Sequence, residues 1–179
     1  MDDQEQLGTP PPSVVIIGDG FEALGRLPLI GRQRVSDHFN EQRTMLILEG
    51  AEIEGTERFD TEADELAINR SEILLVVPVE EQHTGDSVAA NIAMKELHRV
   101  RIMVGDWVVE GDIHVLPEVS VERFINVGHG EFMPLTNVTL SGPGTERHEQ
   151  LVLVSRLHIK MLRPLQGSGV DDYGLVLQS

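Results

Sequence analysis

The histidines are the side chains of this chain best suited to bind a metal ion or to transfer a proton, because the chain contains no cysteine. No two of them have the i, i+4 spacing of a helical H-E-x-x-H zinc site. Two lie in strand-like stretches and one lies between glycines, so a barrel could bring them together, but ordinary structural or solvent-facing histidines are the default interpretation. We predict no catalytic residue and no metal ligand among the seven, which are His38, His83, His98, His114, His129, His148 and His158.

A second candidate for cation binding is the acidic run at residues 60–65, Asp-Thr-Glu-Ala-Asp-Glu. Alternating carboxylates of this kind are typical of calcium loops. The run lacks the central glycine and the bidentate glutamate at the twelfth position that an EF-hand loop requires. We therefore interpret it as a solvated acidic loop.

Patterns for nucleophilic catalysis and phosphate binding are also incomplete. Neither Ser36 nor Ser120 lies in a G-x-S-x-G sequence, so neither is predicted to be a nucleophile. The Gly18-Asp19-Gly20 sequence follows a predicted strand without a G-x-G-x-x-G or G-K-[ST] pattern, which favours a hairpin turn. The single tryptophan, Trp107, is predicted to lie in the core and not in a ligand cage. We accordingly expect no cofactor.

The overall charge restricts the partners of the protein. Thirty acidic and 14 basic residues give a formal net charge of −16, which disfavours binding to nucleic acid phosphates. The N-terminal residues have neither a basic nor an apolar signal region, and no apolar run is long enough to span a membrane. Together with the absence of cysteine, these features predict a cytoplasmic protein that binds neither nucleic acid nor membranes.

The elements that must position these residues occur twice, because the chain resembles itself when it is shifted by 86 residues. Apolar positions, an interior glycine and an asparagine recur in the same order. One inserted residue then aligns Met45 with Phe132, and the original offset returns at Arg70 and Arg156. Without a gap, the shift aligns Ile16 with Ile102, Phe21 with Trp107, Gly25 with Gly111, Leu27 with Ile113, and Asn40 with Asn126.

Each copy is predicted to contain five short strands and one helical turn. Apolar residues alternate with others from residue 21 to 29 and from 107 to 115, which predicts a strand in each range, with Asp112 facing solvent. The glycine in the middle of each strand is expected to mark a bend, a bulge or a close approach of the backbone. Residues 36–40 and 121–126 favour a helical turn with Ser36 or Ser120 as N-cap and a left-handed Asn40 or Asn126 at its end. The other strands of the first copy are expected at 14–17, 44–48, 66–68 and 73–77. Those of the second copy are expected at 131–135, 151–154 and 157–162, together with an opening strand that the 86-residue shift aligns with residues 14–17.

The segments outside the two copies are assigned separately. The proline-rich residues 1–13 are predicted to be a disordered leader. In the linker, residues 79–99, a helix is one possibility for residues 87–97 because the apolar residues follow i, i+4 spacing. The tail, residues 165–179, is rich in glycine and then turns apolar at Leu175-Val176-Leu177, which could add a strand to a sheet edge.

The order of these elements resembles that of Sm-like and SH3-like small barrels. A V-x-D/E-x-x-N pattern at residues 35–40, an F/M-x-x-L strand and an I-N-R-S-E-I closing hairpin are similar to a bacterial domain of unknown function of about this size. The resemblance covers residues 14–78 and 100–164. It implies a mostly β fold of two tandem five-stranded small barrels, each with one short helical turn, and it implies no activity.

We predict from these observations a non-enzymatic interaction or scaffolding protein. Small sheets of short strands leave open edges that pair readily with another strand, so we expect self-association or binding of a protein partner through a sheet edge. The alternative is a small-molecule or metal-binding protein with a pocket between the two barrels. RNA binding by analogy with Sm proteins is disfavoured by the charge of −16.

Overall fold

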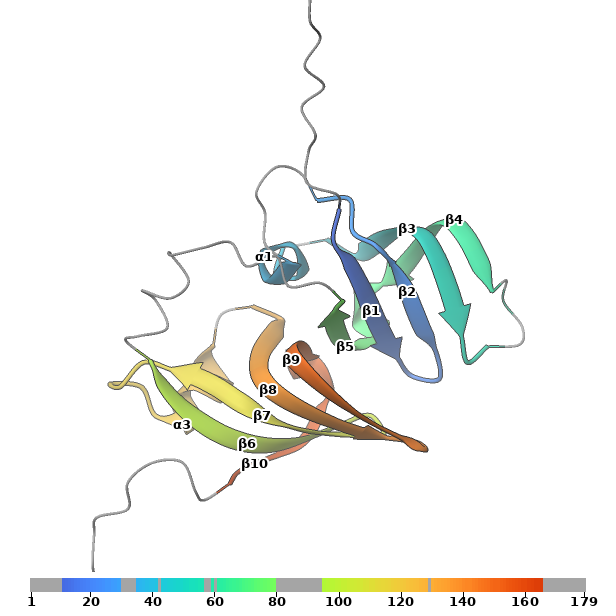
Figure 1. Cartoon of the computed structure of the whole chain (residues 1–179). Helices are drawn as coiled ribbons and strands as arrows, with labels where there is room; N and C mark the ends of the chain where they lie inside the picture. Colours follow the sequence, from blue (N-terminus) through green and yellow to red (C-terminus); the bar gives the residue numbers. More distant parts are fainter. Residues whose placement is uncertain are drawn as a thin grey trace, which may run out of the picture. The chain divides into compact units, whose positions relative to one another are not determined.

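The structure, a computed structural model, describes residues 11–29, 35–41, 43–56, 59, 61–79, 95–128 and 130–165. This part of the chain is mostly β, with ten strands and two short α-helices, as predicted (Figure 1). The first half contains β1 (Ser13–Gly18), β2 (Glu22–Arg26), α1 (Val35–Phe39), β3 (Met45–Glu54), β4 (Glu62–Asn69), a 3-10 turn (Arg70–Glu72) and β5 (Ile73–Pro78).

The second half has the same order of elements. It contains β6 (Glu96–Val104), β7 (Trp107–Val115), α3 (Val121–Val127), β8 (Phe132–Gly142), β9 (Thr145–Ser155), a 3-10 turn (Arg156–His158) and β10 (Ile159–Pro164). Three elements begin 86 residues after their counterparts in the first half: α3 after α1, the second 3-10 turn after the first, and β10 after β5. The offset found in the sequence therefore also relates the element boundaries.

The strands form one open antiparallel sheet in the order β10-β6-β7-β8-β9-β5-β1-β2-β3-β4. The expected pair of closed barrels is not confirmed. Instead of each set of five strands closing on itself, the end of β9 pairs with β5, with Leu75 opposite Val154 and Val76 opposite Leu153. The strands β4 and β10 stand at the two ends of the strand order, and each has one strand neighbour in the described part of the chain.

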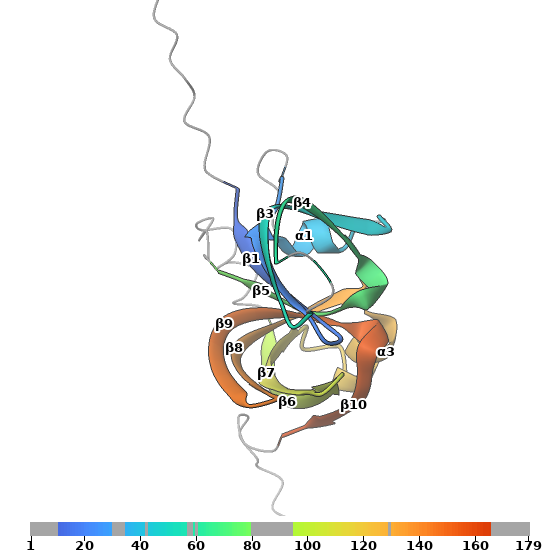
Figure 2. The same cartoon turned by 90° about the vertical axis from the view of Figure 1, so that its right-hand side faces the viewer.

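The chain divides into two compact units that cut across the two halves of the sequence. Unit 1 comprises Met1–His83, Gly130–Pro134 and Leu151–His158, and unit 2 comprises Thr84–His129, Leu135–Gln150 and Ile159–Ser179. The strands β8 and β9 are long and strongly curved, as Figure 2 shows, and each contributes residues to both units.

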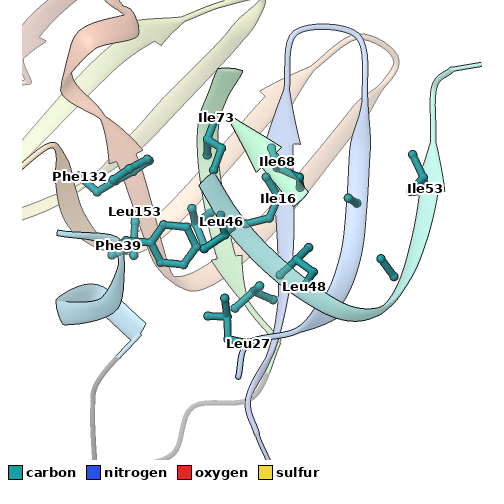
Figure 3. Packing of buried hydrophobic residues seen from close by; sticks show 14 residues of the cluster. Ile16, Leu27, Phe39, Leu46, Leu48, Ile53, Ile68, Ile73, Phe132 and Leu153 are labelled. Carbon is teal, nitrogen blue, oxygen red and sulfur yellow. The ribbon is translucent and has the colours of Figure 1, made fainter. Parts of the chain in front are cut away.

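The core of unit 1 is built from aliphatic residues of β1 to β5 and from two phenylalanines (Figure 3). The rings of Phe39 in α1 and Phe132 in β8 meet edge to face, with centroids 5.4 Å apart. Leu153 of β9 belongs to the same cluster. Phe132 and Leu153 lie far from the other members in sequence, so the apolar interior of unit 1 requires residues from both halves of the chain.

In unit 2 the predicted alternation is confirmed along β7, where every second residue from Trp107 to Val115 is buried. Gly111 occupies one of these positions, and the register of β7 with β8 shifts between Glu110 and Asp112. The equivalent Gly25 lies where the register of β2 with β3 shifts between Leu24 and Arg26. Both glycines therefore lie at strand irregularities, as predicted.

Several local predictions are corrected. Asn40 and Asn126 do not adopt left-handed backbones, because Asn137 alone among the described non-glycine residues has a positive φ. Each donates its side-chain amide to the carbonyl oxygen four residues earlier, Asn40 to Ser36 and Asn126 to Glu122. This hydrogen bond completes the helical turn without a left-handed residue.

Strand lengths also differ from the predictions. The strand expected over residues 21–29 ends at Arg26. The amide of Leu27 still donates to the carbonyl of Pro12, but Pro12 has no N–H to return this bond and Pro28 has none to continue the ladder. The possible linker helix was expected to continue to Leu97, but Glu96 and Leu97 lie in β6. Residues 1–10 of the leader, 80–94 of the linker and 166–179 of the tail lie outside the described residues, and so does the expected strand at 175–177.

Candidate functional site

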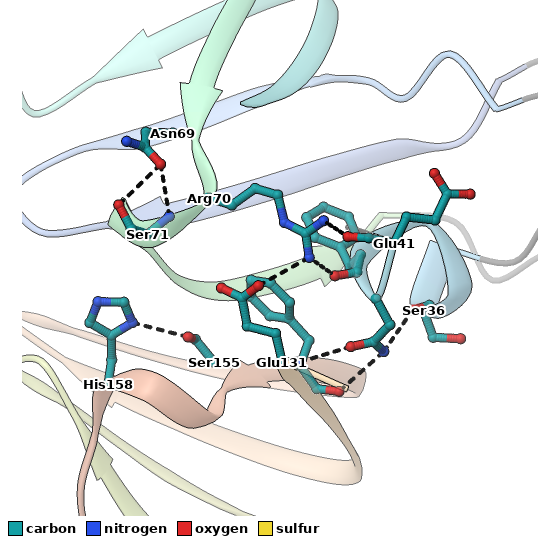
Figure 4. Close-up of polar contacts among 11 residues, drawn as sticks. Ser36, Glu41, Asn69, Arg70, Ser71, Glu131, Ser155 and His158 are labelled. Carbon is teal, nitrogen blue, oxygen red and sulfur yellow. Dashed lines mark hydrogen bonds and ion pairs between the residues drawn. The ribbon is translucent and has the colours of Figure 1, made fainter. Parts of the chain in front are cut away.

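A buried arginine lies at the centre of a polar cluster in unit 1 (Figure 4). Arg70, which follows β4, is 4% exposed, and its guanidinium donates to the carbonyl oxygens of Phe39 and Glu41 at the end of α1. One of its nitrogens lies 3.3 Å from the Glu131 carboxylate. The guanidinium carbon lies 5.7 Å from the centroid of the Phe132 ring. A cation at the C-terminal carbonyls of a helix is electrostatically favourable, so this cluster holds α1 against the start of β8.

Asn40 holds the first residue of β8 through both of its polar atoms. The amide of Phe132 donates to Oδ1 of Asn40 over 3.0 Å, and Nδ2 of Asn40 donates to the carbonyl of Phe132 over 3.3 Å. Gly130 is required beside this contact, because a Cβ there would lie 2.4 Å from the same Oδ1. The asparagine therefore has the structural role expected from the sequence, although through a different geometry.

A shallow pocket of about 520 Å³ opens beside this cluster, lined by Asn40, Glu41, Arg43, Thr44, Arg70, Gly130 and Glu131. The buried guanidinium of Arg70 already bonds two carbonyl oxygens and a carboxylate, and Asn40 already bonds Phe132. A ligand would therefore have to displace contacts that hold the fold together. The residues that line this pocket therefore have a structural role, and the pocket gives no support to the binding of a small molecule.

The described histidines have separate surroundings. His38 is buried in α1, and desolvation by burial lowers its pKa, opposed by Glu41 and assisted by Arg43 and Arg70. Burial also lowers the pKa of His114, whose Nε2 lies 2.8 Å from the Thr136 hydroxyl.

The other described histidines contact separate partners, and Nε2 of His98 lies 3.5 Å from the Glu96 carboxylate. Nδ1 of His158 lies 3.0 Å from the Ser155 hydroxyl, and Nδ1 of His148 lies 3.1 Å from the Thr139 hydroxyl. His83 and His129 lie outside the described residues. Within the part of the chain that the structure covers, no three His, Cys, Asp or Glu side chains gather as they would around a metal ion.

The other sequence candidates have structural positions. Ser120 is the N-cap of α3 and accepts from the amide of Arg123, as predicted, whereas Ser36 lies inside α1, which begins at Val35. The sequence Gly18-Asp19-Gly20 joins β1 to β2 as the predicted hairpin turn. Trp107 is 8% exposed and packs in the core of unit 2.

The predicted acidic loop is wrong in one respect. Asp60 lies outside the described residues, but residues 62–65 belong to β4 and are not a loop. The side chains of Glu62, Asp64 and Glu65 are exposed along this strand. The edge strand β4 is therefore acidic. The sequence pattern alone did not show that these acidic residues lie on a sheet edge.

The outer edge of β10 is an exposed surface with apolar side chains. In the equivalent strand β5, all residues from Ile73 to Val77 are buried. In β10, 86 residues later, none is buried, and Met161 is 60% exposed whereas its counterpart Leu75 is 0% exposed. The difference has a physical cause: β5 pairs with β1 on one side and β9 on the other, while β10 pairs with β6 alone in the described part.

No protein-family model, no curated protein and no solved structure matches this chain. None of the helices in the described ranges is long and apolar enough to cross a membrane. Sequence reasoning had named open edges in general but had not identified β4 and β10. The aligned positions Leu75 and Met161 could not reveal this, because both are apolar and only the pairing partner differs.

Proposed function

We propose that this protein is a non-enzymatic interaction or scaffolding module that self-associates, or binds a protein partner, through the outer edges of β4 and β10. The observation that carries the proposal is the exposure of β10 set against the burial of β5. An edge strand with exposed apolar side chains and unpaired backbone groups is a template for a further strand. Met161 and the neighbouring Leu157, 60% and 71% exposed, give this edge apolar surface for a partner to cover.

We further propose that the two halves of the chain arose by duplication of one five-stranded unit of the SH3-like kind. The proposal is supported by the 86-residue offset of sequence and element boundaries. It is also supported by the strand order, which reads β5-β1-β2-β3-β4 in the first half and β10-β6-β7-β8-β9 in the second. We also propose that the protein is cytoplasmic and has no nucleic acid or membrane partner, which the lack of cysteine and the net charge of −16 support.

The test is the mass of the purified full chain, measured by light scattering after size exclusion at several concentrations. The wild-type protein is expected to exceed the chain mass of 19.8 kDa. Met161→Asp introduces a charge on the edge of β10 and is expected to lower the mass towards that of a single chain. The control is Leu24→Asp, since Leu24 is 39% exposed but lies in β2, which has a strand on each side.

Two results would contradict the proposal. One is a single-chain mass for the wild-type protein at every concentration. The other is an equal loss of mass in both variants, because the association would then not depend on the edge. Circular dichroism of both variants shows whether either substitution has unfolded the chain.

A further inference from the structure

The pairing of β5 with β9 provides a template for the two unpaired edges. Leu75 lies opposite Val154, and Val76 lies opposite Leu153. Moving the β5 residues forward by 86 positions gives Met161 and Leu162 of β10, and moving the β9 residues back by 86 gives Ile68 and Ala67 of β4. The same contact would therefore place Met161 opposite Ile68 and Leu162 opposite Ala67. The strands β4 and β10 are the edges that remain open in the described sheet.

The surroundings of this template differ in burial from those of the open edges. At the template, α1 buries His38 and Phe39, and Phe132 at the start of β8 is 1% exposed. In the open counterpart, α3 has no buried residue, and Met45 at the start of β3 is 43% exposed. Apolar positions that are buried in one copy are thus only half-buried in α3 of the other, and exposed at Met45.

The template also contains a polar contact whose equivalent is not made in the other copy. Asn40 bonds Ser36 within its helical turn and both backbone atoms of Phe132. The side chain of Asn126 retains the helical-turn bond to Glu122, and it shows no equivalent of the Phe132 bonds among the described residues. The residue aligned with Phe132 is Met45, so the backbone of Met45 in another chain is the group that Asn126 would bond.

The charges of the two edges are complementary. The exposed ionic side chains of β4 are acidic, namely Glu62, Asp64 and Glu65, whereas those of β10 are basic, namely Lys160 and Arg163. In the derived register, Arg163 lies opposite Leu66 and diagonal to Asp64 on the same face. Pro164 does not prevent pairing, because Pro78 occupies the equivalent position in β5, which pairs on both sides. Two copies of β4 or two copies of β10 would instead bring like charges together.

We propose that the partner of each edge is a second copy of this chain, joined head to tail. The β10 strand of one chain pairs antiparallel with β4 of the next, with Met161 opposite Ile68 and Leu162 opposite Ala67. Asn126 bonds the backbone of Met45 in that next chain. This inference rests on the proposed function, and it adds the identity of the partner, the direction and the register. A head-to-tail contact repeats from chain to chain, so the assembly is a closed ring or an open filament.

The test uses engineered cysteines, because the natural chain has none. Two full-length variants, Ala67→Cys and Leu162→Cys, carry tags of different mass and are mixed under mild oxidation. Directly opposed residues of antiparallel strands are within the distance that a disulfide requires. The expected product is the mixed dimer, with little of either homodimer. The matched control is Met161→Cys mixed with Ala67→Cys, because a slip of one residue places the sulfur on the opposite face.

The outcomes separate the inference from the proposed function. A Leu162→Cys homodimer, or equal cross-linking by the Met161→Cys control, would overturn the direction or the register. The same two cysteine variants are also mixed in a form that lacks residues 171–179. If cross-links form only in this shortened form, the chain's own tail occupies an edge in the full chain, and the inference fails. Absence of the mixed dimer from a protein that light scattering shows to be associated would overturn the inference alone. A protein of single-chain mass would overturn the proposed function as well.

Discussion

Replacing Gly111 with valine tests the packing of unit 2 where β7 departs from regular pairing. A Cβ at this position would lie 3.0 Å from Cγ2 of Val138 and 3.1 Å from both Cβ and Cδ2 of Leu135. Both neighbours are buried, so they have little room to move. Overpacking of a well-packed core costs about 1–3 kcal/mol, and valine carries two methyl groups beyond Cβ.

Part of this loss is offset in the unfolded state, because glycine loses more conformational freedom on folding than other residues, by about 0.5–1 kcal/mol. We therefore expect Gly111→Val to lower the free energy of unfolding by about 2 kcal/mol. For a chain of this size, such a loss corresponds to a fall in melting temperature of about 4–8 °C. Fluorescence of Trp107, the single tryptophan, reports the unfolding of the same strand.

The control is Glu110→Val, which adds the same side chain one position earlier on the opposite face of β7. Glu110 forms a surface ion pair with Arg101, and the loss of such a pair costs about 0–1 kcal/mol. We expect the free energy of unfolding of this variant to be much closer to that of the wild type than the value for Gly111→Val. Equal losses in both variants would show that the assignment of inner and outer faces along β7 is wrong.

Three further predictions concern unit 1. Arg70→Met should lower the free energy of unfolding by about 3 kcal/mol, because it leaves two backbone carbonyls and the Glu131 carboxylate without their donor. Glu131→Gln keeps an acceptor oxygen, so it should lower the same free energy, measured by urea unfolding, by about 1 kcal/mol or less. Burial lowers the pKa of His38, so its contribution to stability is complete above the unfolded pKa of about 6.5 and is lost as the pH falls towards the folded value. His38→Phe should therefore reduce the decline in stability between pH 7.5 and 5.5, by at most about 1.4 kcal/mol per pH unit, and an unchanged decline would contradict the assignment. Asn40→Ala should lower the melting temperature more than Asn126→Ala in a dilute, dissociated sample, since Asn40 alone also bonds Phe132; equal shifts would show that the bonds to Phe132 add nothing.

Local patterns predicted the elements well where the neighbours of a residue in sequence determine its environment. The alternation from Trp107 to Val115 placed β7 at its observed bounds, and the glycine within it marked a register shift. The sequence Gly142-Pro143-Gly144 marked the turn between β8 and β9. Ser120 was identified as an N-cap because capping depends on residues within one helical turn.

Features that depend on distant residues could not be predicted in the same way. Arg70 and Asn40 were aligned with counterparts, but their bonds to Glu131 and Phe132 span 61 and 92 residues. Asp112 was expected to face solvent, yet it pairs with Arg99 and accepts from Asn137, because the register shift brings β8 alongside it. The two closed barrels were not found for the same reason: alternation shows that a strand has an inner face, but not which strand it pairs with.

Amide hydrogen exchange along the two edge strands reports directly whether the chains associate through β4 and β10. The exchange of β4 (Glu62–Asn69) and β10 (Ile159–Pro164) is compared with that of β2 (Glu22–Arg26), which has a strand on each side, over a range of protein concentrations. We expect the protection of β4 and β10 to rise with concentration while that of β2 stays constant, because only the edges gain a hydrogen-bonded neighbour. Edge amides that exchange at the same rate at every concentration would contradict this expectation.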